Sequence, residues 1–204
     1  MVKNIFIGGS RVSQLCCDGK LPDPVCARLK NMIDEECHIL IGDANGVDKM
    51  VQDYLRQRGY KKVTVYYSGD RLRNKADDSW DTKHIPIDAT GKKLSGYEVQ
   101  KLKDKKMVEK ADAGYMIWAD TYINKRFGNK CVSKGTLSNI FNLLFENKPV
   151  TVYYIPEGCE YVIESSDDFE NNKLWLSVDQ QTKKKWNELR NKQNRQNKQM
   201  LLIS

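Results

Sequence analysis

Five short runs of apolar and β-branched residues recur along the chain, and most of them are continuous rather than alternating. Continuous runs of this length are typical of strands that are covered on both faces of a sheet. We therefore predict five buried strands, at residues 5–7, 38–41, 63–67, 115–118 and 150–154.

Between these runs, apolar residues return with the period of a helix, which gives each segment a stripe that can pack on a sheet. The stripes are Val25, Leu29, Met32 and Ile33; Val47, Met50, Val51, Tyr54 and Leu55; and Leu137, Ile140, Phe141, Leu144 and Phe145. A less regular helix is expected over residues 97–111. The alternation predicts an α/β fold, a Rossmann-like three-layer sandwich with a mostly parallel sheet of about five strands.

The length of 204 residues suits one well-buried core with appendages. We expect the main domain at residues 1–156, with residues 68–96 as a lid or small insertion because that stretch has no clear period. Residues 157–204 form a C-terminal extension in this interpretation. It holds a short strand-like run at 161–163, and its Asn-, Gln- and Lys-rich end is expected to be a fraying helix or a disordered tail.

The net charge of +7 is concentrated at the C-terminal end. From residue 183 onward seven lysines and arginines accompany a single glutamate, so the rest of the chain is nearly neutral. Trp186 is the only aromatic residue among these cations, whereas a stacking platform for bases needs several. We therefore expect at most a weak, salt-sensitive nucleic-acid contact through this tail.

No apolar run approaches the roughly 18 residues that a membrane span needs, and no export signal is apparent. A cytoplasmic location without membrane contact is therefore expected, with the six cysteines as free thiols. No cluster of residues has metal-ligand spacing, but a divalent metal could bind through coordination to a bound phosphate.

Three glycine-containing polar loops follow predicted strands or precede predicted helices. In a parallel sheet ligands collect at the carboxyl ends of the strands, where backbone amides and helix starts attract phosphate. The candidate ligand-binding residues are Gly8, Gly9, Ser10 and Arg11; Gly42, Asp43, Asn45, Gly46 and Asp48; and Ser133, Lys134, Gly135 and Thr136. Together these loops predict a site for a nucleotide or another small molecule that carries phosphate.

Three further residues are candidates at the margin of this site. Asp70 and Arg71 could contact a base or sugar from the side, although exposed loop charges are more often solvated. Trp118 ends the fourth predicted strand and is a candidate for the pocket wall, with core packing as the alternative.

The order of these motifs resembles the SLOG superfamily, and within it the YspA-like and YAcAr-like branch. The resemblance spans roughly residues 4–154 and rests on Gly-Ser-Arg at 9–11, the loop at 42–48, Lys103-Asp104 with Met107, and the segments 111–118 and 133–140. The superfamily includes the DNA-processing protein DprA and the Lonely Guy phosphoribohydrolases. The resemblance implies a nucleotide sensor or processor on a Rossmannoid sheet, of a kind often linked to bacterial conflict systems.

The chain departs from the Lonely Guy pattern at the catalytic glutamate, because Ser138-Asn139 follow the Gly-Thr pair and the next acid is Glu146. If the chain cleaves an N-glycosidic bond, the carboxylate would come from Asp104 or Asp48, with Asp43 and Asp120 as further candidates. A charged residue on a helix surface is the alternative for Asp104. Three functions remain open: a nucleotide-binding sensor without turnover, an N-glycosidic-bond hydrolase, and a protein that binds single-stranded nucleic acid. The sequence also leaves open monomer or homo-oligomer.

Overall fold

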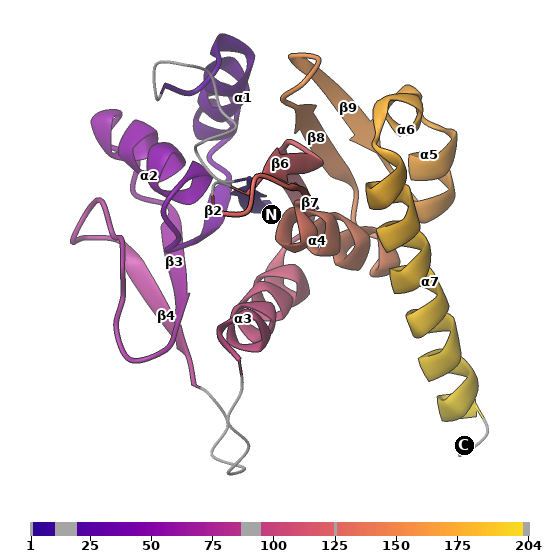
Figure 1. Ribbon diagram of the computed structural model, residues 1–204. Coiled ribbons are helices and arrows are strands. Elements are labelled where there is room, and N and C mark those ends of the chain that lie inside the picture. The colour runs from indigo at the N-terminus through magenta and orange to yellow at the C-terminus, as the bar shows by residue number, and fades with distance from the viewer. Residues whose placement is uncertain (1, 11–19, 87–94, 125, 202–204) are drawn as a thin grey trace.

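The computed structural model describes residues 2–10, 20–86, 95–124 and 126–201, and a seven-stranded sheet forms its centre (Figure 1). The strand order is β4-β3-β2-β1-β5-β8-β9, and every neighbouring pair is parallel except β8 with β9. The strands are β1 (Asn4–Gly9), β2 (His38–Gly42), β3 (Val63–Ser68), β4 (Asp81–Ile85), β5 (Ala113–Trp118), β8 (Val150–Tyr154) and β9 (Cys159–Ile163). The Rossmann-like α/β fold is thereby confirmed.

All five strands predicted from apolar runs belong to this sheet. Strand β5, next to the central strand β1, pairs with β1 on one side and β8 on the other, and all six of its residues are buried. A strand in this position has no polar face, which explains why its sequence does not alternate.

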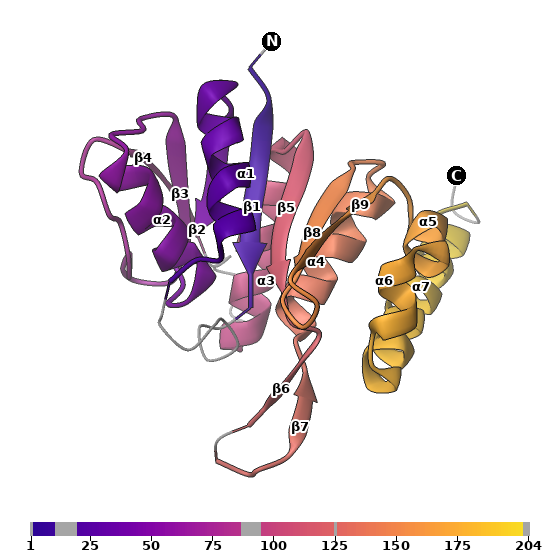
Figure 2. The same cartoon turned by 90° about the horizontal axis from the view of Figure 1, so that it is seen from above.

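Helices cover both faces of the sheet (Figure 2). Helices α1 (Asp23–Asp34) and α2 (Val47–Gln57) pack on one face, and α3 (Gly96–Lys110) and α4 (Lys134–Phe145) pack on the other. Two separate clusters of buried side chains follow from this division, one under each helix pair. The helices predicted from periodic stripes and the irregular helix over 97–111 are all present.

Part of the segment predicted as a lid or insertion instead extends the sheet. Strand β4 pairs in parallel with β3 at the sheet edge, and four of its five residues are exposed. Its sequence Asp-Thr-Lys-His-Ile carries no apolar run because an edge strand can keep most of its side chains in water. Within the same segment Trp80 is buried, and its indole N–H donates to the Tyr60 carbonyl at 2.8 Å.

The C-terminal extension is joined to the same core. Strand β9 pairs antiparallel with β8, and it is followed by α5 (Ser166–Asn171), α6 (Lys173–Ser177) and α7 (Gln180–Leu201). Phe169, Leu174 and Trp186 from these helices are fully buried in the cluster that also contains Trp118. The segment expected to be a fraying helix or a disordered tail forms helix α7 from Gln180 to Leu201.

The residues between β5 and α4 contain a small hairpin. Strands β6 (Thr121–Ile123) and β7 (Lys130–Val132) pair antiparallel and project from the body of the protein (Figure 2). In the part of the chain that the structure describes, no helix combines the length and apolarity that a membrane span requires.

Candidate functional site

A cavity of about 390 Å³ lies where the carboxyl ends of β1 and β2 face α3 and the start of α4. Strand β1 has β2 on one side and β5 on the other, so the strand order changes direction at β1. This reversal of direction opens a crevice at the strand ends, the usual ligand position in open α/β sheets. All three predicted loops contribute to the cavity lining.

The first loop contributes Gly8, Gly9 and Ser10. The Ser10 hydroxyl lies between β1 and β5: it accepts a hydrogen bond from the Ala119 N–H at 3.0 Å and lies 3.2 Å from the Ser133 hydroxyl. Ser10 therefore connects the end of β1 to the start of α4 as well as lining the cavity. Arg11 lies outside the described residues.

Packing alone requires a glycine at position 9. A Cβ atom at this position would lie 2.4 Å from the Ile117 carbonyl oxygen and 2.8 Å from Val47 Cγ2. We expect Gly9→Ala to lower the free energy of unfolding by about 1 to 3 kcal/mol, because β1, β5 and α2 would have to separate. Urea unfolding measures this change.

Gly135→Ala is the matched control for Gly9→Ala. A Cβ at Gly135 would meet no neighbouring atom within 4 Å, and alanine favours the helical conformation. Its free energy of unfolding should stay equal or rise slightly. Equal losses in the two variants would contradict this assignment of Gly9.

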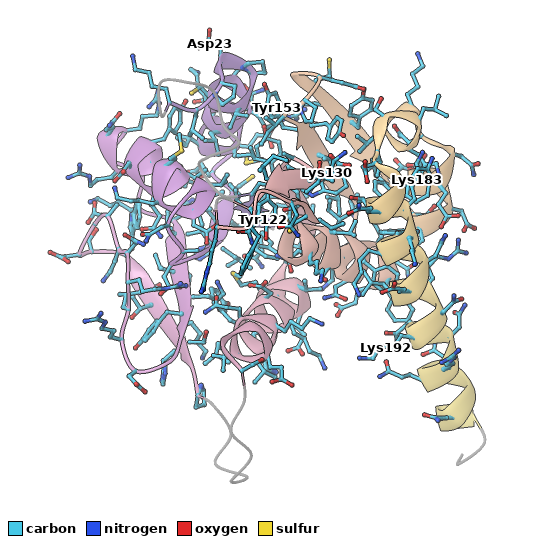
Figure 3. The ribbon with its side chains drawn as sticks, in the orientation of Figure 1. Asp23, Tyr122, Lys130, Tyr153, Lys183 and Lys192 are labelled. Atoms are coloured by element: carbon cyan, nitrogen blue, oxygen red, sulfur yellow. The ribbon has the colours of Figure 1, made fainter. Side chains whose placement is uncertain are left out.

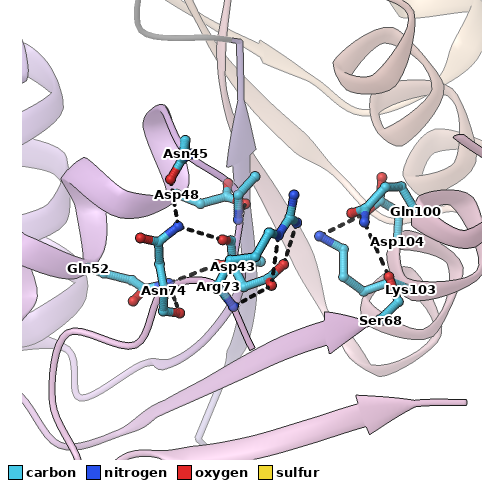
Figure 4. A network of polar contacts seen from close by, with 12 residues as sticks. Asp43, Asn45, Asp48, Gln52, Ser68, Arg73, Asn74, Gln100, Lys103 and Asp104 are labelled. Atoms are coloured by element: carbon cyan, nitrogen blue, oxygen red, sulfur yellow. Dashed lines mark hydrogen bonds and ion pairs between the residues drawn. The ribbon is translucent and has the colours of Figure 1, made fainter. Parts of the chain in front are cut away.

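Some residues of the second loop line the cavity, and others hold the loop in its conformation. Gly42 and Asp48 line the cavity, whereas Asp43 is fully buried and receives two hydrogen bonds from the Arg73 guanidinium, at 2.6 and 3.0 Å. Asn45 is exposed and accepts a hydrogen bond from the Asn74 amide. Gly46 precedes α2 with φ of 119°, a backbone conformation that favours glycine. Asp43, Asn45 and Gly46 thus shape the loop without lining the cavity (Figure 4).

Helix α4 begins at the third loop. Ser133, Lys134, Gly135 and Thr136 all line the cavity, and the Ser133 side chain makes no capping hydrogen bond to the first turn. The first backbone N–H groups of a helix have no partner within the helix, and the helix dipole adds partial positive charge there. This turn, with the exposed Lys134 ammonium on it, is therefore suited to hold an anion.

The floor of the cavity carries one lysine and two carboxylates (Figure 4). Lys103 on α3 is only 3% exposed, and its ammonium lies 3.5 Å from Asp104 Oδ1. Asp48 accepts a hydrogen bond from the Ala44 N–H at 3.2 Å. A Cβ at Gly42 would lie 2.4 Å from Asp48 Oδ2 and 2.6 Å from Lys103 Nζ, so this glycine leaves the space in which both groups meet.

Burial sets the protonation of these carboxylates. It raises the pKa of Asp48 to about 6, although the Lys103 ammonium and the Ala44 N–H oppose the rise. Burial also raises the pKa of Asp104, opposed by Lys103 and by a hydrogen bond with Asn139. At Asp43 burial acts in the same direction, but hydrogen bonds from Arg73 outweigh it and lower the pKa. Asp48 can therefore exchange a proton near neutral pH while Asp43 stays ionised.

Four other predicted residues lie away from the cavity lining. Asp70 and Arg71 are exposed. Trp118 is fully buried in the core near Tyr154 and Phe169, and its indole nitrogen has no hydrogen-bond partner among the described residues. Asp120 is buried as well, and it accepts hydrogen bonds from the Tyr154 hydroxyl and the Asp179 N–H. Of the four candidate carboxylates, only Asp48 and Asp104 reach the cavity.

Several cavity residues had no assigned role in the sequence interpretation. They are Gln100, Lys103, Tyr122, Cys131 and Asn139, contributed by α3, α4 and the β6–β7 hairpin. Figure 3 shows Tyr122 on that hairpin. Lys103 could have been found, because it adjoins Asp104 within a motif that carries the family resemblance, whereas the hairpin has no pattern that points to the cavity. Within the described ranges, no group of three or more histidine, cysteine or carboxylate side chains could hold a metal ion.

Comparison with models of known protein families finds no match for the chain, and comparison with curated proteins finds no relative.

Proposed function

We propose that the protein binds a nucleotide or a nucleotide-derived phosphate ligand in the cavity at the ends of β1 and β2. The single observation that carries the proposal is the meeting of three loops, the open first turn of α4 and the ammonium of Lys103 around one cavity. The phosphate would lie at the start of α4, where the N–H groups of the first turn, Lys134 and Thr136 can contact it. The motif order that resembles the SLOG superfamily supports the same class of ligand.

The charges of the lining favour a ligand that has an anionic group at one end and hydrogen-bond donors at the other. Lys134 lies at the start of α4, while Asp48 and Asp104 lie with Lys103 at the floor. Carboxylates accept hydrogen bonds from hydroxyl or amino groups, and a nucleotide carries such groups on its sugar and base. The arrangement suits an anionic group at one end and hydrogen-bond donors at the other.

Lys134→Ala should weaken binding of a nucleoside monophosphate about fivefold to tenfold, which corresponds to roughly 1 to 1.4 kcal/mol. The affinity should also depend less on salt, since one exposed charge contact is lost. Calorimetric titration with AMP, ADP-ribose and inorganic phosphate measures both changes. Lys30→Ala on α1, an exposed lysine paired with Asp34, is the control and should bind like the unchanged protein. Equal affinities of Lys134→Ala and the control would remove the proposed phosphate position.

A second candidate function is hydrolysis of an N-glycosidic bond, and the pair of carboxylates on the cavity floor favours it. Asp48, with its pKa near 6, can take a proton from water near neutral pH, and Asp104 supplies the second carboxyl group that this chemistry needs. Asn139 of α4 occupies the helix turn where a Lonely Guy enzyme has its glutamate, and it hydrogen-bonds Asp104.

Release of free base from nucleoside monophosphates, NAD or ADP-ribose distinguishes the two candidates. If the protein is a hydrolase, Asp48→Asn and Asp104→Asn should each lower kcat by at least about a hundredfold, the range of general acid–base catalysis. Asp70→Asn, an exposed loop residue outside the cavity, should keep the full rate. Chromatography of the reaction products measures the rate. Binding without any release of base would leave the sensor function.

A further inference from the structure

A second cavity, of about 450 Å³, lies on the opposite side of α3 and α4, where α7 forms its third wall. Figure 1 shows α4 between α3 and α7. Helix α4 packs against both α3 and α7, so the cavity is a groove between helices. Its lining consists of Lys101, Leu102, Lys105, Val108, Ser138, Asn142, Phe145, Glu146, Leu189, Gln193 and Gln196, and we call it the α3–α4–α7 groove.

The base of this groove presents apolar side chains to solvent. Phe145 is 42% exposed and Leu102 is 38% exposed, and Leu189 on α7 is partly buried beside them. Exposed large apolar residues that gather in one hollow, rather than singly, are typical of a surface that binds a partner.

The rim of the groove is basic and amide-rich. Lys101 and Lys105 stand on α3, and Gln193 and Gln196 continue the face of α7 that begins with Leu189. Lys192 and Arg195, next to those glutamines, are exposed, and Figure 3 shows Lys192 on α7. Glu146 is the only acidic residue of the lining, and it forms an ion pair with Lys148 at 2.9 Å.

We propose that the α3–α4–α7 groove binds an acidic amphipathic helix of a partner protein. The apolar face of such a helix would contact Leu102, Phe145 and Leu189, and its carboxylates would meet the lysines of the rim. A helix that enters a groove in this way uses apolar residues at positions i, i+3 or i+4, and i+7.

Two other occupants fit the groove less well. A single-stranded nucleic acid would find cations but only one aromatic side chain, Phe145, on which a base could stack. A second copy of this chain would bring its own basic α7 against the basic rim, because residues 183–204 carry seven lysines and arginines and one glutamate. Like charges facing one another oppose such contact.

The test uses the full chain and a labelled synthetic peptide of about four helical turns, roughly 15 residues, with leucines at helical spacing and glutamates elsewhere. A scrambled peptide of the same composition, which has no apolar stripe, is the first control. Fluorescence anisotropy should show that the amphipathic peptide binds about tenfold more tightly than the scrambled one.

Variants of the groove locate the binding. Leu102→Ser and the double exchange Lys101→Glu with Lys105→Glu should each weaken binding of the amphipathic peptide at least about tenfold. Leu176→Ser is the matched control, since Leu176 on α6 is 81% exposed and lies outside the groove. The lysine exchange keeps the test valid if Leu102→Ser disturbs folding, because both lysines are exposed.

Four results would overturn the proposal. The first is that the amphipathic peptide does not bind, and the second is that the scrambled peptide binds equally well. The third is that a labelled oligothymidylate binds and is lost in the same variants, which would make the groove a nucleic-acid surface. The fourth is that analytical ultracentrifugation finds a dimer that Leu102→Ser dissociates, which would assign the groove to a second copy.

Discussion

Replacing Trp186 by alanine should lower the free energy of unfolding by about 3 to 5 kcal/mol, the usual cost of removing a fully buried tryptophan. Trp186 is 0% exposed, and its ring lies 4.4 Å from the Phe169 ring and 5.2 Å from the Phe141 ring, centre to centre. Its indole N–H also donates to Glu170 at 2.6 Å. The substitution would therefore leave a cavity and remove a hydrogen bond. Urea unfolding measures the loss.

Lys192→Ala provides the control on the same helix. Lys192 is exposed, so the free energy of unfolding should change by less than about 0.5 kcal/mol. If Trp186→Ala changed stability as little as this control does, α7 would be a solvated tail and the C-terminal helices would not belong to the core.

As the pH rises from 4 to 7, the free energy of unfolding of Asp48→Asn should gain about 2 kcal/mol relative to that of the unchanged protein. The pKa of Asp48 is about 6 in the folded protein and near 3.9 in an unfolded chain. Between these two values the folded protein holds a proton that the unfolded chain has released, so stability falls as pH rises. Above pH 6 both states have lost the proton and the full penalty remains. Asparagine does not titrate, so the free energy of unfolding of the variant does not fall for this reason as the pH rises.

Urea unfolding at several pH values between 4 and 8 measures the difference between the two proteins. The difference, rather than either curve, is informative, because carboxylates with lowered pKa such as Asp43 contribute in the opposite direction in both proteins. Asp70→Asn, at an exposed position, should follow the unchanged protein. Parallel curves for Asp48→Asn and the unchanged protein would contradict the raised pKa of Asp48.

Most of the sheet could be predicted because its strands are buried on both faces. Continuous apolar runs as short as those of β5 and β8, and as rich in β-branched and aromatic residues, indicate buried strands rather than helices. Strand β4 could not be predicted in the same way, because its place at the sheet edge leaves Asp81, Thr82, Lys83 and His84 exposed. Its position depends on pairing with β3, which is a property of the folded sheet and not of the local sequence.

The meeting of the three loops at one cavity could be predicted from the sequence, but the contacts of the individual side chains could not. Parallel strands bring their carboxyl ends to one edge, so three loops could be placed together in advance. Which side chains face the cavity depends on distant partners: Asp43 pairs with Arg73, thirty residues further along the chain. Lys103 lies on a helix with a weakly periodic sequence, and only the fold turns its ammonium toward Asp104.

The pairing of β9 with β8 has a consequence for where the chain can be cut. A product that ended at residue 156 would leave the outer backbone edge of Val150–Tyr154 without its hydrogen-bond partners. This run is rich in valine and tyrosine, and an open edge of that composition invites pairing between molecules and aggregation. A shortened chain that ends at residue 156 should therefore precipitate rather than fold into a smaller stable protein.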